Sequence, residues 1–267
     1  MKTLRTILFA LLALGLAGGA YGLFMQGYVH AKFAPVPRRQ APDLSAPAAA
    51  WQAGGNPLFL HQVNTPGRAR AKERKYPGFE LDLSQDKQGR LYVAHDEKGL
   101  SKRVRLNDIF AALQRPQDKS WWIDLKFAPT EAQIDEILSV AAQYAIPAQQ
   151  LLFEAGPGPT AQLLKEKDLG LLLQIPEGFE EDGGNPAHRQ ALNAQALQEW
   201  QQYRPAAVAA SFGKYPFLKA YFPNMPKAIY YSGTVRPSYK KPLMKRHMLK
   251  DPSVRIFMLD EYTLLPF

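Results

Sequence analysis

The chain contains no cysteine among its 267 residues. Disulfide bonds, thiolate zinc sites, cysteine nucleophiles and lipid attachment through cysteine are therefore excluded. The lack of cysteine also suits an oxidising compartment, where a stray thiol is easily oxidised. Any chemistry in this chain must rest on other side chains.

The chain also lacks the pattern of a nucleic-acid-binding surface, although it is basic. Its net charge is +9 and its pI is about 9.6. A basic balance suits nucleic acid, anionic lipid or a phosphorylated substrate equally, and a general solubility charge explains it as well. Basic residues are scattered apart from modest clusters at residues 68–75 and 240–246, and no stretch interleaves them with aromatic residues. We therefore predict no nucleic-acid partner.

Charge is absent from a long run near the N-terminus. Lys2 and Arg5 precede an uncharged segment from Ile7 to Met25. About 19 residues in a helix span roughly 28 Å, close to the hydrocarbon thickness of a bilayer. With the basic residues on the cytoplasmic side, we predict a signal anchor over residues 1–27, a single transmembrane helix in the cell membrane, and an extracytoplasmic chain after it, periplasmic or extracellular. Small residues between Ala17 and Gly22 also offer a cleavage site, in which case the protein is secreted.

Residues 28–56 show no hydrophobic period. They contain four prolines, an alanine run and a Gly-Gly pair. Such a composition predicts an extended linker between the membrane and a folded domain. Hydrophobic residues make up 46% of the whole chain, as is usual for a globular protein with a buried core. We assign that domain to residues 57–267.

From residue 57 onward, short apolar runs alternate with helical patterns. Strands are expected at 58–63, 78–83, 91–94, 121–127, 151–155, 169–175, 206–211, 228–232 and 254–259. Helices are expected at 106–113, 130–145, 160–167, 194–203 and 242–249. This alternation indicates parallel βαβ units, hence either a doubly wound sheet or a (β/α)₈ TIM barrel.

One connection departs from the alternation. The runs 78–83 and 91–94 are joined by seven residues, too few for a crossover helix, so this pair is predicted to be a β-hairpin after the second strand. Eight parallel strand candidates remain when the hairpin arm is set aside. That number favours the barrel.

Polar residues lie near the ends of several of these strands. Because side chains alternate along a strand, Glu80 and Asp82 share one face, and Asp124 and Lys126 share one face of another strand. Burial of these charges under a helix would be costly, so we expect them to face the lumen near its mouth. Active sites of such barrels lie at the C-terminal ends of the strands, where His61 is also expected.

The predicted cluster has the composition of a metal-assisted phosphodiester site. Glu80, Asp82 and Asp124 would repel one another without a cation, and oxygen ligands favour Mg²⁺ or Ca²⁺. His61 and His95 are then free for proton transfer, since one imidazole can be a neutral base while the other is an imidazolium acid.

Lys126 is placed to stabilise charge on phosphoryl oxygens. Glu154, at the end of 151–155, is a further ligand or substrate contact, or else caps the following turn. One of Tyr230 and Tyr231 should face the lumen. The simpler explanation of a lone strand histidine is a hydrogen-bonded structural residue, and a His-Asp pair such as His95-Asp96 also occurs by chance.

Taken in order, these residues resemble the glycerophosphodiester phosphodiesterase superfamily, the phospholipase C-like barrels that include the sphingomyelinases D. Those families share a strand-end His, a Glu-x-Asp on the next strand, a second His after a short hairpin and an acidic-x-Lys. The matching residues here are His61, Glu80-Leu81-Asp82, His95-Asp96 and Asp124-Leu125-Lys126. The resemblance implies a TIM barrel, one divalent cation on Glu80, Asp82 and Asp124, and acid–base catalysis by His61 and His95.

The segment after the first His departs from the phosphodiesterase pattern. An Arg-Gly pair follows that His in the glycerophosphodiesterases, whereas this chain has Gln62-Val63. The sequence His61-Gln62-Val63-Asn64 is closer to the opening of sphingomyelinase D, although that family's cysteine-bearing loop is absent. The substrate class is therefore left open between glycerophosphodiesters and phospholipid headgroups.

The prediction is a membrane-anchored, metal-dependent phosphodiester hydrolase or transphosphatidylase that uses two histidines. Its nucleophile is either water or a hydroxyl of the substrate. The alternative from another class is a catalytically inactive barrel that serves as a tethered binding or scaffolding protein. A third possibility is a metal-independent phospholipase C, against which the three carboxylates argue. The oligomeric state is not indicated by the sequence.

Overall fold

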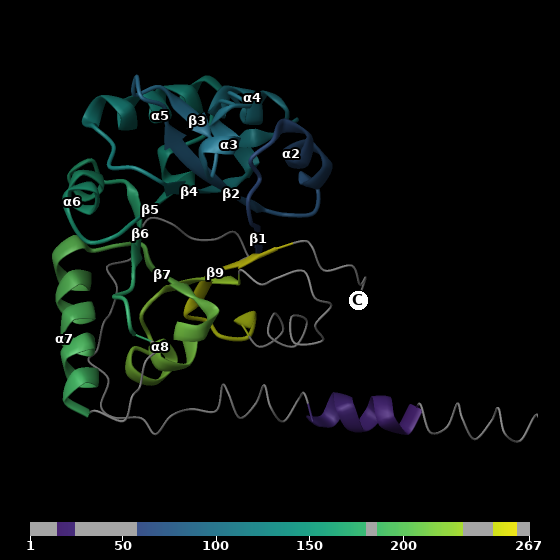
Figure 1. The fold of residues 1–267 in the computed structure, drawn as a ribbon, viewed down its shortest axis with the longest axis vertical. Coiled ribbons are helices and arrows are strands. Elements are labelled where there is room, and N and C mark those ends of the chain that lie inside the picture. The colour runs from purple at the N-terminus through teal and green to yellow at the C-terminus, as the bar shows by residue number, and fades with distance from the viewer. Residues whose placement is uncertain (1–14, 25–57, 180–185, 232–247, 261–267) are drawn as a thin grey trace, which may run out of the picture.

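The structure, a computed structural model, describes residues 15–24, 58–179, 186–231 and 248–260. Its strands form one sheet in the order β1-β9-β8-β7-β6-β5-β4-β2-β3, and β1 also pairs with β2. All of these pairings are parallel except that of β2 with β3. Eight strands therefore close into a parallel barrel, which confirms the predicted (β/α)₈ architecture (Figure 1).

Every predicted strand is present, with small shifts at the ends. The strands are β1 (Leu58–Leu60), β2 (Gly78–Gln85), β3 (Leu91–Val93), β4 (Ser120–Leu125), β5 (Leu151–Ala155), β6 (Gly170–Gln174), β7 (Ala207–Ser211), β8 (Lys227–Tyr231) and β9 (Val254–Leu259). The antiparallel pairing of Leu83 with Val93 confirms the predicted hairpin between β2 and β3.

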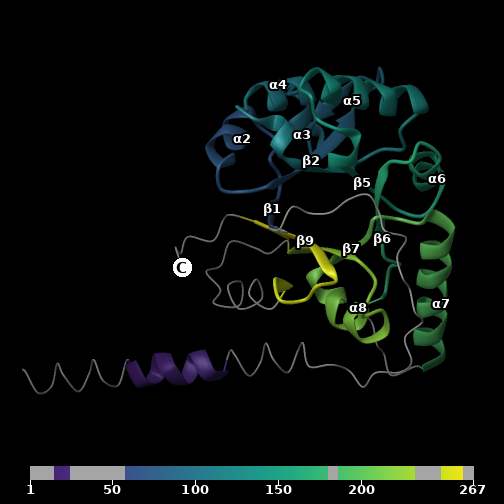
Figure 2. The ribbon, with the colours of Figure 1, turned by 180° about the vertical axis from the view of Figure 1, so that it is seen from behind.

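The connections are helical, and both views place the helices outside the barrel (Figures 1 and 2). The α-helices are α2 (Pro66–Lys72), α3 (Glu97–Leu100), α4 (Leu106–Ala111), α5 (Glu131–Gln143), α6 (Pro159–Glu166), α7 (Pro186–Tyr203) and α8 (Tyr215–Tyr221). Short 3-10 helices η1 (Pro116–Asp118), η2 (Ala148–Gln150) and η3 (Phe212–Lys214) complete the connections. The predicted helix 242–249 lies almost wholly outside the described residues.

The capping signal of α5 has the expected geometry. The Thr130 hydroxyl accepts a hydrogen bond from the Gln133 N–H, and the Gln133 side chain accepts one from the Thr130 N–H. Two of the N–H groups that a helix start leaves unpaired are thereby satisfied. In contrast, α2, α3 and α8 are too short to show a helical period and were not predicted.

The core has two layers separated by the sheet. Outward-facing strand residues pack beneath the helices in two apolar clusters. Inward-facing residues fill the lumen with a third cluster, whose buried members are Phe59, Trp122, Leu152, Leu172, Ala207, Ala209, Ala228, Ile256 and Met258. The lumen is therefore a packed core, and polar side chains can gather only towards its ends.

The N-terminal prediction is largely untested. Residues 15–24 are helical and exposed, and the remainder of the predicted span over 1–27 lies outside the described residues. Within the part of the chain that the structure describes, no helix has the length and apolar character needed to cross a bilayer. The predicted transmembrane helix is thus not supported by the described residues, and the predicted linker at 28–56 lies outside them.

Candidate active site

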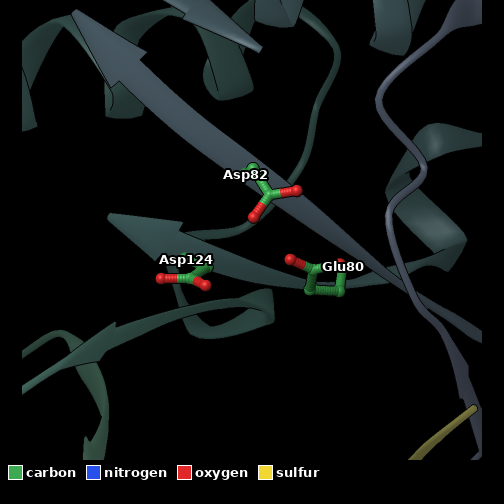
Figure 3. A group of neighbouring side chains, drawn as sticks. All are labelled: Glu80, Asp82 and Asp124. Atoms are coloured by element: carbon green, nitrogen blue, oxygen red, sulfur yellow. The ribbon is translucent and has the colours of Figure 1, made fainter. Parts of the chain in front are cut away.

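Three carboxylates converge at the mouth of the barrel. Glu80 and Asp82 extend from β2 and Asp124 from the neighbouring β4, and their carboxyl groups point towards one another (Figure 3). One oxygen from each residue lies within 4.8 Å of the other two. The structure therefore brings together the three residues that the sequence proposed as metal ligands.

The strand register explains this convergence. Asp82 is the direct partner of Asp124 across the parallel β2–β4 pair. Glu80 lies two residues earlier on β2, so it shares the inward face with Asp82. Both β2 carboxylates are almost fully buried, at 1% exposure each, and the barrel fixes their separation.

Burial and repulsion from neighbouring carboxylates raise the pKa of two of these groups, Glu80 and Asp124. Burial, followed by the charge of Asp82, raises the pKa of Glu80 well above its usual value. Burial likewise raises the pKa of Asp124, although Lys126 opposes the shift. The site thus favours any cation that neutralises these oxygens.

Lys126 supplies part of that neutralisation. It follows β4 directly, and its ammonium group forms ion pairs with Asp124 and, at 2.8 Å, with Asp82 Oδ1. Burial alone would lower the pKa of Lys126, but its bonds to Asp124 and Asp82 raise the pKa above the usual value. Lys126 is therefore a permanent cation beside the carboxylates.

The donor set fits a hard divalent cation. Asp82 Oδ1 is buried, and the contact that meets it among the described residues is the ion pair with Lys126 Nζ at 2.8 Å, a single positive charge beside three carboxylates. Such an oxygen is costly to bury unless a cation or donor meets it. Three carboxylate oxygens from rigid strands match the preference of Mg²⁺ and Ca²⁺, and the geometry does not choose between them.

The loop after β1 holds the two β2 carboxylates in place. The strand ends at Leu60, earlier than predicted, because Gln62 adopts a left-handed conformation with φ of 54°. Its N–H donates to Glu80 Oε2 at 2.5 Å, and the Val63 N–H donates to the Glu80 carbonyl. The Asn64 amide donates to Asp82 Oδ2 at 2.6 Å and accepts a bond from the Asp82 N–H. One oxygen of each carboxylate is therefore fixed, which orients the other.

Replacement of Asn64 by alanine is expected to weaken divalent cation binding by about 10- to 100-fold, the usual effect of losing a residue that orients a metal ligand. Isothermal calorimetry of the purified chain measures this change. The matched control is Gln62→Ala, which retains the backbone bond to Glu80 and should bind the cation nearly as well as the wild type. Equal affinity in Asn64→Ala and wild type would show that Asn64 does not position Asp82.

His61 belongs to a hydrogen-bonded dyad that the sequence did not predict. His61 Nδ1 lies 2.5 Å from Asp260 Oδ1, and its Nε2 lies 3.9 Å from Glu80 Oε2. Asp260 directly follows β9, the strand that pairs with β1. With Nδ1–H donating to Asp260, the Nε2 atom of His61 is directed towards the carboxylates.

An arginine also approaches the first histidine, although none follows it in the sequence. Arg68, on α2, donates from Nη2 to the His61 carbonyl at 3.0 Å. The absence of Arg-Gly after His61 therefore does not leave this part of the site without an arginine. Arg68 was not singled out from the sequence because it lies seven residues further along.

His95 approaches the same mouth from the hairpin. It lies two residues after β3, and the Ala94 N–H donates to the Asp82 carbonyl at 2.9 Å. The His95 side chain is exposed, and its charge acts on Asp124, whose pKa it lowers slightly against the larger effect of burial. The structure thus places His95 next to the carboxylates on the solvent side.

Glu154 extends the polar floor of the site from β5. It pairs in register with Asp124, accepts a hydrogen bond from Trp122 Nε1 at 2.8 Å and another from Gln174 Nε2 at 3.0 Å. Glu154 thus contacts lumen side chains instead of capping a turn. Tyr230, on the inward face of β8, packs edge-on against Trp122. The predicted lumen tyrosine is therefore Tyr230.

Burial, then the charge of Asp124, raises the pKa of Glu154 to about 7 from its usual 4.5. Because the folded state binds this proton more tightly than the unfolded chain, stability falls as pH rises from 4.5 to 7. Without divalent cations, Glu154→Gln should therefore gain stability relative to the wild type over this range, by on the order of 3 kcal/mol. Urea denaturation at several pH values measures the difference. A difference that is constant with pH would contradict the shifted pKa.

Sequence comparisons do not identify the chain. No protein-family model matches it, and no curated protein matches it. The fold, in contrast, is similar to solved barrels. A putative glycerophosphodiester phosphodiesterase from Galdieria sulphuraria aligns with a TM-score of 0.52 and 13% identity, over 77% of this chain and 93% of that one.

Two further structural neighbours have lower TM-scores. A glycerophosphodiester phosphodiesterase from Parabacteroides distasonis aligns with a TM-score of 0.46 and 9% identity, over 77% of this chain and 93% of that one. Orotidine 5'-monophosphate decarboxylase from Sulfolobus solfataricus has a TM-score of 0.46 and 11% identity, over 77% of this chain and 88% of that one. At 13% identity, the likeness to the Galdieria sulphuraria structure shows the fold alone.

Proposed function

We propose that the chain is a metal-dependent phosphodiester hydrolase acting on glycerophosphodiesters or phospholipid headgroups. The observation that carries this proposal is the gathering of Glu80, Asp82 and Asp124 at the barrel mouth, next to two histidines and a lysine. A cation held by the three carboxylates would draw charge from a phosphoryl oxygen. The remaining steps are assigned to the chain's own side chains.

His61 is suited to act as the general base. Asp260 accepts the Nδ1 proton, so Nε2 carries the lone pair that takes a proton from the nucleophile, either water or a substrate hydroxyl. Asp260 also stabilises the imidazolium that results, as a carboxylate partner does for histidine in other hydrolytic sites. Water yields the open phosphomonoester, and a substrate hydroxyl yields a cyclic phosphate.

His95 is suited to act as the general acid. Its exposed position lets it exchange protons with solvent and give one to the leaving alkoxide. Lys126 remains protonated beside Asp82 and Asp124, so its ammonium can stabilise negative charge that builds on the phosphoryl group. Removal of the nucleophile's proton and protonation of the leaving group are thereby assigned to different histidines.

The competing function is a non-catalytic barrel that binds or scaffolds through the same mouth. Calorimetric titration with Mg²⁺ and Ca²⁺, followed by a substrate screen, separates the two. The screen uses glycerophosphocholine, glycerophosphoethanolamine, lysophospholipids and sphingomyelin, each with either cation and with EDTA. A phosphodiesterase should bind the cation and release product only in its presence. Failure to bind either cation at millimolar concentration would favour the non-catalytic barrel, and full activity in EDTA would favour metal-independent chemistry.

The location of this activity follows from the N-terminal prediction. If residues 1–27 anchor the chain in the cell membrane, the barrel acts outside the cytoplasm, and cleavage of that segment would release it as a secreted enzyme. A membrane anchor would also hold the barrel near phospholipid substrates.

A further inference from the structure

A run of exposed basic side chains follows His95. Of the eight residues from 98 to 105, four are basic and none is acidic. We refer to these four as the basic rim, and all of them are exposed: Lys98, Lys102, Arg103 and Arg105. The rim therefore presents positive charge to solvent from α3 and the turn before α4.

The basic rim lies at the mouth of the barrel. It begins three residues after His95, and the chain there is bound to β2 by the Ala94–Asp82 backbone bond. Helix α3 packs closely on this segment, since a Cβ atom on Gly99 would lie 2.9 Å from Ala94 Cβ. Helix α3 contacts β3, and Figure 1 shows the two elements side by side. The rim thus adjoins the residues of the proposed active site.

Three acidic residues flank the rim in the sequence, Asp96, Glu97 and Asp108, and two of them bind backbone groups. Asp96 Oδ1 accepts a hydrogen bond from the Gly99 N–H, and Asp108 Oδ2 accepts one from the Arg105 N–H. These two carboxylates cap α3 and α4. Over residues 96–108 four basic side chains stand against three acidic ones, and all four basic ones are exposed.

We propose that the basic rim docks the barrel mouth onto an anionic phospholipid surface. The four side chains are spread over a helix and a turn, an arrangement that suits an extended charged surface better than one small anion. Clusters of about four to eight Lys and Arg residues are typical of segments that bind anionic lipids. This inference rests on the proposed function, because docking at this edge would bring a lipid phosphodiester to His95 and the carboxylates.

Hydrogen exchange of the full-length chain tests the proposal locally. The chain is mixed with phosphatidylcholine vesicles that are prepared with or without phosphatidylglycerol. EDTA is present throughout, so no cation-dependent turnover occurs. Amide exchange over residues 95–105 should slow severalfold only when phosphatidylglycerol is present, and high salt should remove the effect. Because exchange is measured at residues 95–105, the result reports contact at the rim even if other segments of the chain also bind the vesicle.

Two charge-matched variants distinguish docking from general attraction. Lys98→Gln/Lys102→Gln/Arg103→Asn removes three charges from the rim and should abolish the slowing; the asparagine tolerates the left-handed φ of 52° at position 103. Arg70→Gln/Arg74→Gln/Lys75→Gln removes three exposed charges at the other end of the barrel, where α2 leads into β2. This control variant should still show the slowed exchange over residues 95–105.

Three outcomes would overturn the proposal. These are equal exchange with both vesicle types, slowing that persists in the rim variant, or the same slowing by glycerol 3-phosphate without vesicles. Turnover of soluble glycerophosphocholine tests the proposed function separately. The rim variant should retain that turnover, so a failure of docking and a failure of catalysis can be told apart.

Discussion

His61→Ala and His95→Ala are each expected to lower kcat/KM for a phosphodiester substrate by about 10³-fold, within the usual range for loss of a general acid or base. His61 is held by Asp260 with Nε2 facing the carboxylates, and His95 lies on the exposed side of the same mouth. The two replacements should affect the reaction in different ways. An activated leaving group, such as p-nitrophenolate, should rescue His95→Ala and not His61→Ala, because only the acid step becomes dispensable.

Steady-state kinetics with both substrate types measures these effects, and calorimetry in parallel should show nearly unchanged cation binding. His188→Ala is the matched control, since this histidine lies in α7 and plays no part in the proposed site. Near wild-type activity in either active-site variant would show that the acid–base assignment is wrong. Asp260→Asn should cost about 10- to 100-fold, as expected for a residue that orients another.

Glu80→Gln is expected to abolish cation binding and turnover while stabilising the metal-free fold. Glu80 is buried, and burial together with the charge of Asp82 raises its pKa, so at neutral pH the metal-free fold must either bury this charge or take up a proton, and either costs stability. Glutamine removes that charge, and its carbonyl can still accept the Gln62 N–H. Cation affinity should fall by more than about 100-fold, because residues that only orient metal ligands already contribute about 10- to 100-fold.

Calorimetry and thermal unfolding in EDTA measure the two opposite effects. With Mg²⁺ or Ca²⁺ present, the wild type should gain stability by mass action and Glu80→Gln should not. Glu131→Gln is the control, because Glu131 is exposed and pairs with Lys167 on the helical layer. A Glu80→Gln variant that binds the cation normally, or that is less stable than the wild type in EDTA, would contradict the assignment of Glu80.

The strands and the three carboxylates were predictable from local patterns. Apolar runs separated by turns locate all the strands, and the two-residue alternation places Glu80 with Asp82 on one face. The hairpin was predictable because its seven-residue connection cannot contain a crossover helix. The strands, their faces and the hairpin depend on residues that are close together in the sequence, so local sequence patterns predict them.

The remainder of the site depends on contacts that no local pattern records. The His61–Asp260 dyad joins residues 199 positions apart, and it forms because barrel closure places β9 beside β1. The early end of β1 was also not predictable, because the left-handed turn at Gln62 is stabilised by a carboxylate from the next strand. Asn64 was noted only as part of a resemblance, and its bonds to Asp82 became visible in the folded chain.

Phosphorus NMR tests most directly whether this site cleaves phosphodiesters with a bound cation. Glycerophosphodiesters and lysophospholipids are incubated with the wild-type chain in Mg²⁺, in Ca²⁺ and in EDTA, with His95→Ala as the inactive control. The expected result is a new phosphomonoester or cyclic-phosphate resonance with one of the cations, absent in EDTA and in the control. Equal product in EDTA, or no product from any substrate although calorimetry shows a bound cation, would contradict the proposed metal-dependent phosphodiesterase.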